Sequence, residues 1–219
     1  MTVPVVCLTL GIMSVNLAQA VIALPQSPYP PLAVGFFGLG TGYLIWGPQE
    51  LLGYPKRDAS VDFASGVWGI WMPGFMQFFS GVYLFAGLTL FGTFKAPALY
   101  MAALAFTAYG VHWFAIGWNR TRQTDPRVNV GMTIAYTLIS ILGIIVFFGV
   151  GDHPVGGVFI GLTCVYVADF FASLAPDLKA VGHIGERALG FARLGTGFWL
   201  MYLTFAVMLN SVLRYSLPV

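Results

Sequence analysis

Long apolar runs follow one another along nearly the whole chain, and short polar stretches separate them. A helix needs about 20 residues to cross a bilayer, so most of these runs are long enough to form a span. Downstream of residue 31 the expected spans are Leu32–Gly47, Phe63–Phe94, Pro97–Trp118, Val130–Val150, Val155–Leu174 and Leu189–Leu213. The pattern therefore predicts an all-α, polytopic membrane protein with six core transmembrane helices.

One more apolar run, Val3–Leu24, precedes these six. It ends near a small-x-small triplet of the kind that signal peptidases cleave, but no Lys or Arg precedes it, which argues against a signal peptide. We expect residues 1–24 to be a retained N-terminal helix. Residues 25–31 contain four prolines and are expected to form a non-helical linker. Residues 32–219 are then expected to form the six-helix transmembrane domain.

The second expected span, Phe63–Phe94, is too long for an untilted helix. We expect it to kink at Pro73-Gly74, because proline removes one helical hydrogen bond. Gln77 follows one turn later. Its amide either bonds the carbonyls that the break leaves free or is presented to a solute.

The composition excludes an ordinary soluble domain. Charged residues make up 8% of the chain, against about a quarter in soluble proteins. The ten Lys and Arg residues are scattered, so we expect no nucleic-acid partner. His112, His153 and His183 lie in three different segments, and no nucleophile set, phosphate loop or metal-ligand cluster stands out. We therefore expect no enzymatic activity, no metal site and no cofactor. Cys7 and Cys164 are expected to be small core residues.

The basic residues are unevenly distributed between the two ends of the expected spans. Eight of them lie after the first, third and fifth spans: Lys56, Arg57, Arg120, Arg122, Arg127, Lys179, Arg187 and Arg193. Only Lys95 and Arg214 lie at the other end. The positive-inside rule then places the first set in the cytoplasm and the C-terminus outside, in a multi-pass protein of the plasma or inner cell membrane.

Three polar or aromatic side chains share one face of the third span. Tyr109, His112 and Trp113 are spaced i, i+3 and i+4, so they point the same way along a helix. Polar groups at that depth need a protein partner or water, which predicts that this face is turned inward. Tyr109 is either a packed aromatic or a gate residue. His112 is either a satisfied core histidine or a proton relay.

Two charged residues lie within the later spans. Asp169 is costly to bury in a membrane and needs a cation, a proton or water. Arg193, on the following span, is the expected partner in a structural ion pair. The alternative is that Arg193 binds a carboxylate solute while Asp169 holds it in place. We expect Glu50 to lie at the membrane interface.

Short motifs in the second and third spans resemble those of a known family. Phe106-x-x-Tyr109-Gly110-x-x-Trp113 resembles the Phe-x-x-Tyr-Gly-x-Phe-Trp signature of the acetate uptake transporters, the succinate–acetate permeases. Pro73-Gly74-x-x-Gln77-x-x-x-Gly81 is similar to that family's Gly-Gly-x-x-Gln-x-x-x-Gly. The resemblance extends over residues 30–210. This chain departs from the family where it has His112 in place of an aromatic residue, and the hallmark Asn before the first span is absent.

The resemblance implies six-helix protomers that assemble as a homo-oligomer, a hexamer, with one solute path in each protomer. It further implies a mid-membrane constriction of Leu39, Tyr109 and Leu162, with Gln77 lining the path. The function it implies is a channel or transporter for small organic anions such as acetate or succinate, with proton coupling through His112, Asp169 or Arg193 left open. Two alternatives remain: a small-amide or urea channel, and a non-transporting accessory subunit of a larger membrane complex.

Overall fold

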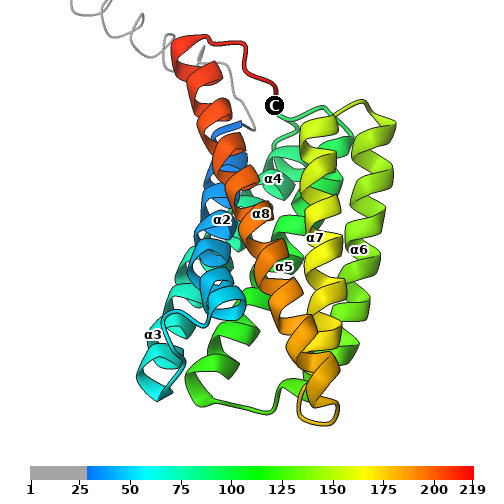
Figure 1. Cartoon of the computed structure of the whole chain (residues 1–219). Helices are drawn as coiled ribbons and strands as arrows, with labels where there is room; N and C mark the ends of the chain where they lie inside the picture. Colours follow the sequence, from blue (N-terminus) through cyan, green and yellow to red (C-terminus); the bar gives the residue numbers. More distant parts are fainter. Residues whose placement is uncertain (1–28) are drawn as a thin grey trace, which may run out of the picture.

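The computed structural model describes residues 29–219, and all regular secondary structure in that range is helical (Figure 1). Six helical rods run up and down, so that successive rods point in opposite directions. The elements are α2 (Tyr29–Leu52), α3 (Ala59–Gly69), η1 (Ile70–Phe75), α4 (Met76–Phe85), η2 (Ala86–Leu90), α5 (Ala98–Arg122), η3 (Pro126–Val128), α6 (Asn129–Gly149), α7 (His153–Ser173) and α8 (Lys179–Leu213). The predicted all-α polytopic fold is confirmed. The expected N-terminal helix, residues 1–24, lies outside the described residues.

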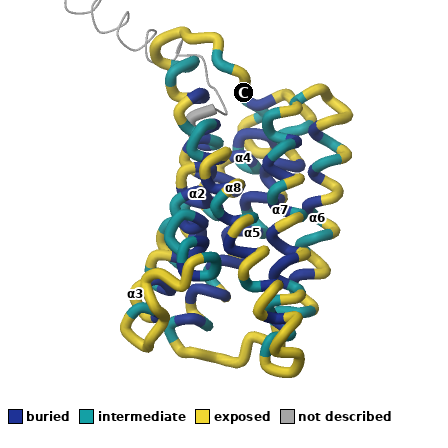
Figure 2. The backbone as a smooth tube through the Cα atoms, viewed as in Figure 1, coloured by how far each residue is buried: buried dark blue, intermediate teal, exposed yellow. Residues whose placement is uncertain are grey.

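Four helices of the described part meet the length and hydropathy requirements for crossing a membrane. They are α5, α6 together with η3, α7 and α8. α2 and the continuous rod from α3 to η2 complete the bundle (Figure 1). α6 presents a mostly exposed face, as Figure 2 shows, and large apolar side chains such as Leu138 and Ile145 cover it. An exposed apolar face of this kind suits contact with lipid tails.

Several sequence-based boundaries are wrong, three of them at the ends of α2 and α8. α2 begins at Tyr29, so residues 29–31 of the predicted linker are helical, because proline is tolerated in the first helical turn. α2 also continues through Pro48 to Leu52, beyond its expected end. α8 begins at Lys179, ten residues before the expected span. Cys164 is exposed on α7 rather than part of the core.

The expected disturbance at Pro73-Gly74 takes the form of a π-helical turn. The rod from α3 to η2 is continuous, and at η1 its hydrogen bonds span five residues instead of four. Pro73 has no N–H to donate, which favours such a local change of pattern. α2 approaches this turn closely, because a Cβ on Gly42 would lie 2.6 Å from the Pro73 ring. The π-turn thus brings α4 and its Gln77 against α2.

The interior of the bundle lies where α2, α4, α5, α7 and α8 meet, and Figure 2 shows the buried residues facing this centre. Glycines allow the helices to approach one another. A Cβ on Gly110 of α5 would lie 2.5 Å from the backbone nitrogen of Phe78 in α4. A Cβ on Gly190 of α8 would lie 2.4 Å from the backbone nitrogen of Leu51 in α2. These close contacts fix which side chains face one another at the centre.

Candidate functional site

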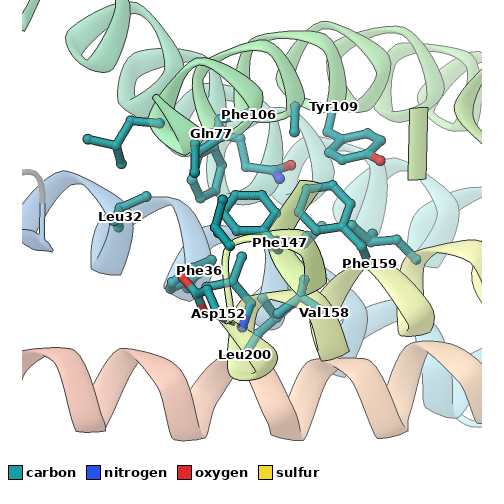
Figure 3. A pocket seen from close by; sticks show the side chains of 18 of the residues that line it. Leu32, Phe36, Gln77, Phe106, Tyr109, Phe147, Asp152, Val158, Phe159 and Leu200 are labelled. Carbon is teal, nitrogen blue, oxygen red and sulfur yellow. Dashed lines mark hydrogen bonds between the residues drawn. The ribbon is translucent and has the colours of Figure 1, made fainter. Parts of the chain in front are cut away.

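A cavity of about 330 Å³ lies inside the bundle, and we refer to it as the apolar cavity (Figure 3). It extends from the connections before α5 and before α7 toward the middle of the helices. Its walls are almost entirely hydrocarbon and aromatic. The lining residues are Leu32, Phe36, Leu39, Gln77, Ala96, Pro97, Ala98, Leu99, Ala102, Ala105, Phe106, Tyr109, Phe147, Val150, Asp152, Val155, Val158, Phe159, Leu162 and Leu200.

The four residues assigned to a solute path all line this cavity. Leu39, Gln77, Tyr109 and Leu162 come from α2, α4, α5 and α7 and are each at most 2% exposed. The outer end of the cavity lies at the connections before α5 and α7. Leu39 on α2, Tyr109 on α5 and Leu162 on α7 are, on their helices, the lining residues farthest from that end. The bundle therefore brings Leu39, Tyr109 and Leu162 together at the closed, inner end of the apolar cavity.

Gln77 is the unusual member of this set. Its side chain is fully buried, yet neither Nε2 nor Oε1 has a hydrogen-bond partner in the described part of the chain. Of the two alternatives for Gln77, the one in which its amide bonds the carbonyls freed at Pro73 is therefore not observed in the described part of the chain. Figure 3 shows the amide among the aromatic side chains of the cavity, near Phe106 and Tyr109. A buried amide without a partner costs about 1–3 kcal/mol.

Beyond the inner end of the cavity lies a cluster of four rings, Tyr109, His112, Tyr136 and Tyr166, which we call the aromatic barrier. The ring centroids of Tyr109 lie 5.4 Å from those of Tyr136 and 5.7 Å from those of Tyr166. The Tyr109 hydroxyl shares a 2.9 Å hydrogen bond with Ser140 Oγ, and the hydroxyl of Tyr166 lies 3.2 Å from His112 Nδ1. The barrier is held by packing and by hydrogen bonds between helices.

His112 is buried, as the helical spacing predicted, and it contacts a tyrosine hydroxyl rather than a backbone carbonyl. Its Nε2 has no partner within the described residues. It does not line the apolar cavity. Trp113 points inward as expected and packs against Tyr43 and Trp46.

A second cavity, of about 150 Å³, lies at the opposite end of the bundle, and we call it the charged cavity. Its lining residues are Trp46, Glu50, Arg57, Ile116, Asn119, Arg120, Gln123, Thr124, Asp125, Pro126, Asn129, Asp169, Leu189 and Arg193. The two lining sets share no residue. The aromatic barrier, with Tyr43 and Trp113 beside it, therefore separates an apolar cavity from a charged one.

The expected ion pair between Arg193 and Asp169 is wrong, because Arg193 Nη1 donates to Glu50 Oε1 instead. Both side chains are buried within the bundle, near the C-terminal end of α2. The cause is the close packing of α2 on α8, in which Gly47 meets Gly190. Because α2 and α8 run antiparallel, Glu50 and Arg193 lie one turn to opposite sides of this glycine contact, and their long side chains reach across it to meet. Asp169 lines the same cavity from α7.

Sequence reasoning missed a second buried cation, Arg120. Its Nε donates to Asp62 Oδ1 at 3.2 Å, and its Nη2 donates to Gln49 Oε1. Asp62 also receives a 2.8 Å hydrogen bond from Arg57. Arg120 Cζ lies 4.2 Å from the centroid of the Trp46 ring. The sequence contained one usable signal: Arg120 lies near the end of an apolar helix, three residues after a glycine that contacts α3.

The loop at the mouth of the charged cavity carries a solvent-exposed ion pair. Arg127 donates to both carboxylate oxygens of Asp125. These side-chain hydrogen bonds from Arg127 lower the pKa of Asp125 to about 2. Asp125 therefore remains ionised at any pH at which the protein would be studied.

Comparison with known proteins identifies one informative structural likeness. The fold is similar to that of a solved structure, the bacterial acetate channel SatP, with a TM-score of 0.64 and 19% sequence identity. The match covers 86% of this chain and 97% of that chain. No protein-family model matches the sequence, and no curated protein matches it. The likeness shows that this chain has an acetate-channel-like fold.

Proposed function

We propose that this protein is a membrane channel or transporter for small organic anions such as acetate or succinate. One observation carries the proposal: Leu39, Tyr109 and Leu162 close an apolar cavity that contains the amide of Gln77, which has no hydrogen-bond partner among residues 29–219. The structural likeness to an acetate channel supports it.

The chemistry of the apolar cavity suits a small carboxylic solute. An acetate ion has a methyl group, which the hydrocarbon walls accept, and two oxygens that need hydrogen-bond donors. The Nε2 of Gln77 offers donors to one oxygen, and its Oε1 can accept a proton-bearing oxygen or a water molecule. An ion without such partners would pay a large desolvation cost in an apolar cavity. The amide therefore gives the solute a polar contact on its way to the barrier.

A urea or small-amide channel is the second candidate, because the Gln77 amide could pair with another amide equally well. An accessory-subunit role fits less well. In that role the candidate path residues would be buried against neighbouring side chains, whereas here they line one cavity.

We expect each protomer to carry its own path, so that assembly into the hexamer implied by the family resemblance would not be needed to complete it. We expect the protein to reside in the plasma or inner cell membrane.

The experiment that tests this proposal measures solute uptake into liposomes containing the purified protein. At pH 8 nearly all acetate is ionised, so little crosses the lipid by itself as the neutral acid. Labelled acetate should enter protein-containing liposomes faster than empty ones, and a pH dye inside them reports whether protons follow. Faster uptake of urea but not acetate would favour the amide channel. Equal uptake of both solutes with and without protein would contradict both transport functions.

Gln77→Leu should make the protein more stable and less active. Leucine fills nearly the same space without a polar group, so the cost of the unpartnered amide, about 1–3 kcal/mol, is relieved. The melting temperature in detergent should rise by a few degrees, while acetate uptake falls.

The matched control is Gln49→Leu, which makes the same change at the partner of Arg120. It should lower the melting temperature, because it leaves a buried guanidinium short of an acceptor. A fall in stability for Gln77→Leu as large as that for Gln49→Leu would show that the amide of Gln77 has a structural partner after all.

A further inference from the structure

Resting on the proposed function, we propose that Arg193 is a second binding site for the solute carboxylate, and that Glu50 occupies this site until solute displaces it. The site lies in the charged cavity, on the far side of the aromatic barrier from Gln77. The solute would thus have a polar contact on each side of the barrier. Glu50 would act as a tethered competitor of the carboxylate that passes.

The ion pair between Arg193 and Glu50 is incomplete on both sides. Arg193 is 3% exposed and donates through Nη1 to a single oxygen, Oε1 of Glu50. Its Nε and the second oxygen of Glu50, Oε2, have no partner in the described part of the chain. A guanidinium binds a carboxylate best when two parallel N–H groups meet the two oxygens. A free carboxylate can adopt that geometry, so it can offer Arg193 a contact that Glu50 does not make.

Arg193 has supports that do not depend on Glu50. Its Cζ lies 5.2 Å from the centroid of the Trp46 ring and 5.9 Å from that of Trp113. Guanidinium groups are attracted to the faces of aromatic rings, most strongly where water is excluded. Asp169 lines the same cavity from α7 and supplies a second negative charge. The cation can therefore stay in place while its acidic partner is exchanged.

A displaced Glu50 also has a place to go. The preceding residue, Gln49, accepts from Arg120, and Arg120 lines the same cavity. Arg120 is shared with Asp62, which has Arg57 as a second partner. A carboxylate leaving Arg193 would therefore remain beside another guanidinium rather than face hydrocarbon. Buried ion pairs are costly to break by removal of one partner, but far less so when one carboxylate replaces another.

The guanidinium of Arg193 determines which class of solute this site would bind. A carboxylate would use the charge and the donor fork of Arg193, whereas a neutral amide such as acetamide would gain little from it. The site therefore favours ionised acids over amides of the same shape.

Binding is measured directly, separately from transport. Purified protein in detergent at pH 8, in chloride-free buffer, is titrated with sodium acetate while tryptophan fluorescence is followed, since Trp46 and Trp113 flank Arg193. Three variants are compared with the wild type: Arg193→Lys, Glu50→Gln, and the control Arg122→Lys. Arg122 lies 4.6 Å from the exposed ring of Trp118 and does not line the cavity.

Arg193→Lys should weaken acetate binding by about tenfold or more, since a point charge replaces the fork. Glu50→Gln should tighten it severalfold, because the competitor loses its charge. Arg122→Lys should leave it unchanged, and acetamide should give no response that depends on Arg193. A purely structural ion pair predicts that Arg193→Lys and Glu50→Gln act alike, and that result, or no effect of either, would overturn the site. Acetate binding of this pattern without liposome uptake would instead contradict the proposed function and leave the site standing.

Discussion

Replacing Ala105 by Trp should abolish acetate uptake through the protein while leaving it folded. Ala105 is 4% exposed and lines the apolar cavity from α5. A cavity of about 330 Å³ has room for an indole, so the added side chain can be accommodated without moving the helices. An indole in the apolar cavity would block it between its outer end and Gln77. We expect uptake at pH 8 to fall to the level of empty liposomes.

The neighbouring residue provides the control. Leu104 is 41% exposed on the outer face of the same helix, so Leu104→Trp adds an indole toward lipid. It should leave acetate uptake unchanged. Melting temperatures of the two variants, measured in detergent, separate a blocked cavity from a misfolded protein. Normal uptake by a folded Ala105→Trp variant would show that the solute does not pass through the apolar cavity.

Gly110→Ala should destabilise the bundle strongly, although it adds only one carbon atom. A Cβ at this position would lie 2.5 Å from the backbone nitrogen and 2.8 Å from the Cα of Phe78. Because these are backbone atoms, α4 and α5 must separate to admit the methyl group. Overpacking of this kind costs about 1–3 kcal/mol or more, and the melting temperature should fall by several degrees.

Gly195→Ala is the matched control, because nothing lies within 4 Å of a Cβ at Gly195. Alanine is the better helix former, so this variant should be as stable as the wild type or slightly more stable, by up to about 1 kcal/mol. If Gly110→Ala had the same melting temperature as Gly195→Ala, α4 and α5 would not be in direct backbone contact at Gly110.

The membrane spans and the inward face of α5 could be predicted from the sequence, for a simple physical reason. Lipid cannot satisfy polar groups, so Tyr109 and His112 had to face the interior, and both are buried. The helix ends were less predictable, because a proline pair ends a helix in some contexts and begins one in others. α2 begins through Pro30 and Pro31.

The pairing of buried charges could not be predicted, because it depends on which helices touch. Arg193 precedes α8's most apolar part and follows α7 in the chain, which made Asp169 the natural partner. In the structure, close packing at Gly47 and Gly190 brings Glu50 of α2 to Arg193 instead. The unpartnered state of Gln77 also needed coordinates, since spacing alone does not show what a side chain lacks.

The central claim is that acetate crosses the membrane through the apolar cavity of this protein. The most direct test compares labelled acetate uptake at pH 8 into liposomes that are empty, that contain the wild type, or that contain Ala105→Trp in equal amount. Uptake above background in the wild type alone is the predicted result. Equal uptake in all three preparations, with both proteins folded and inserted, would contradict the claim.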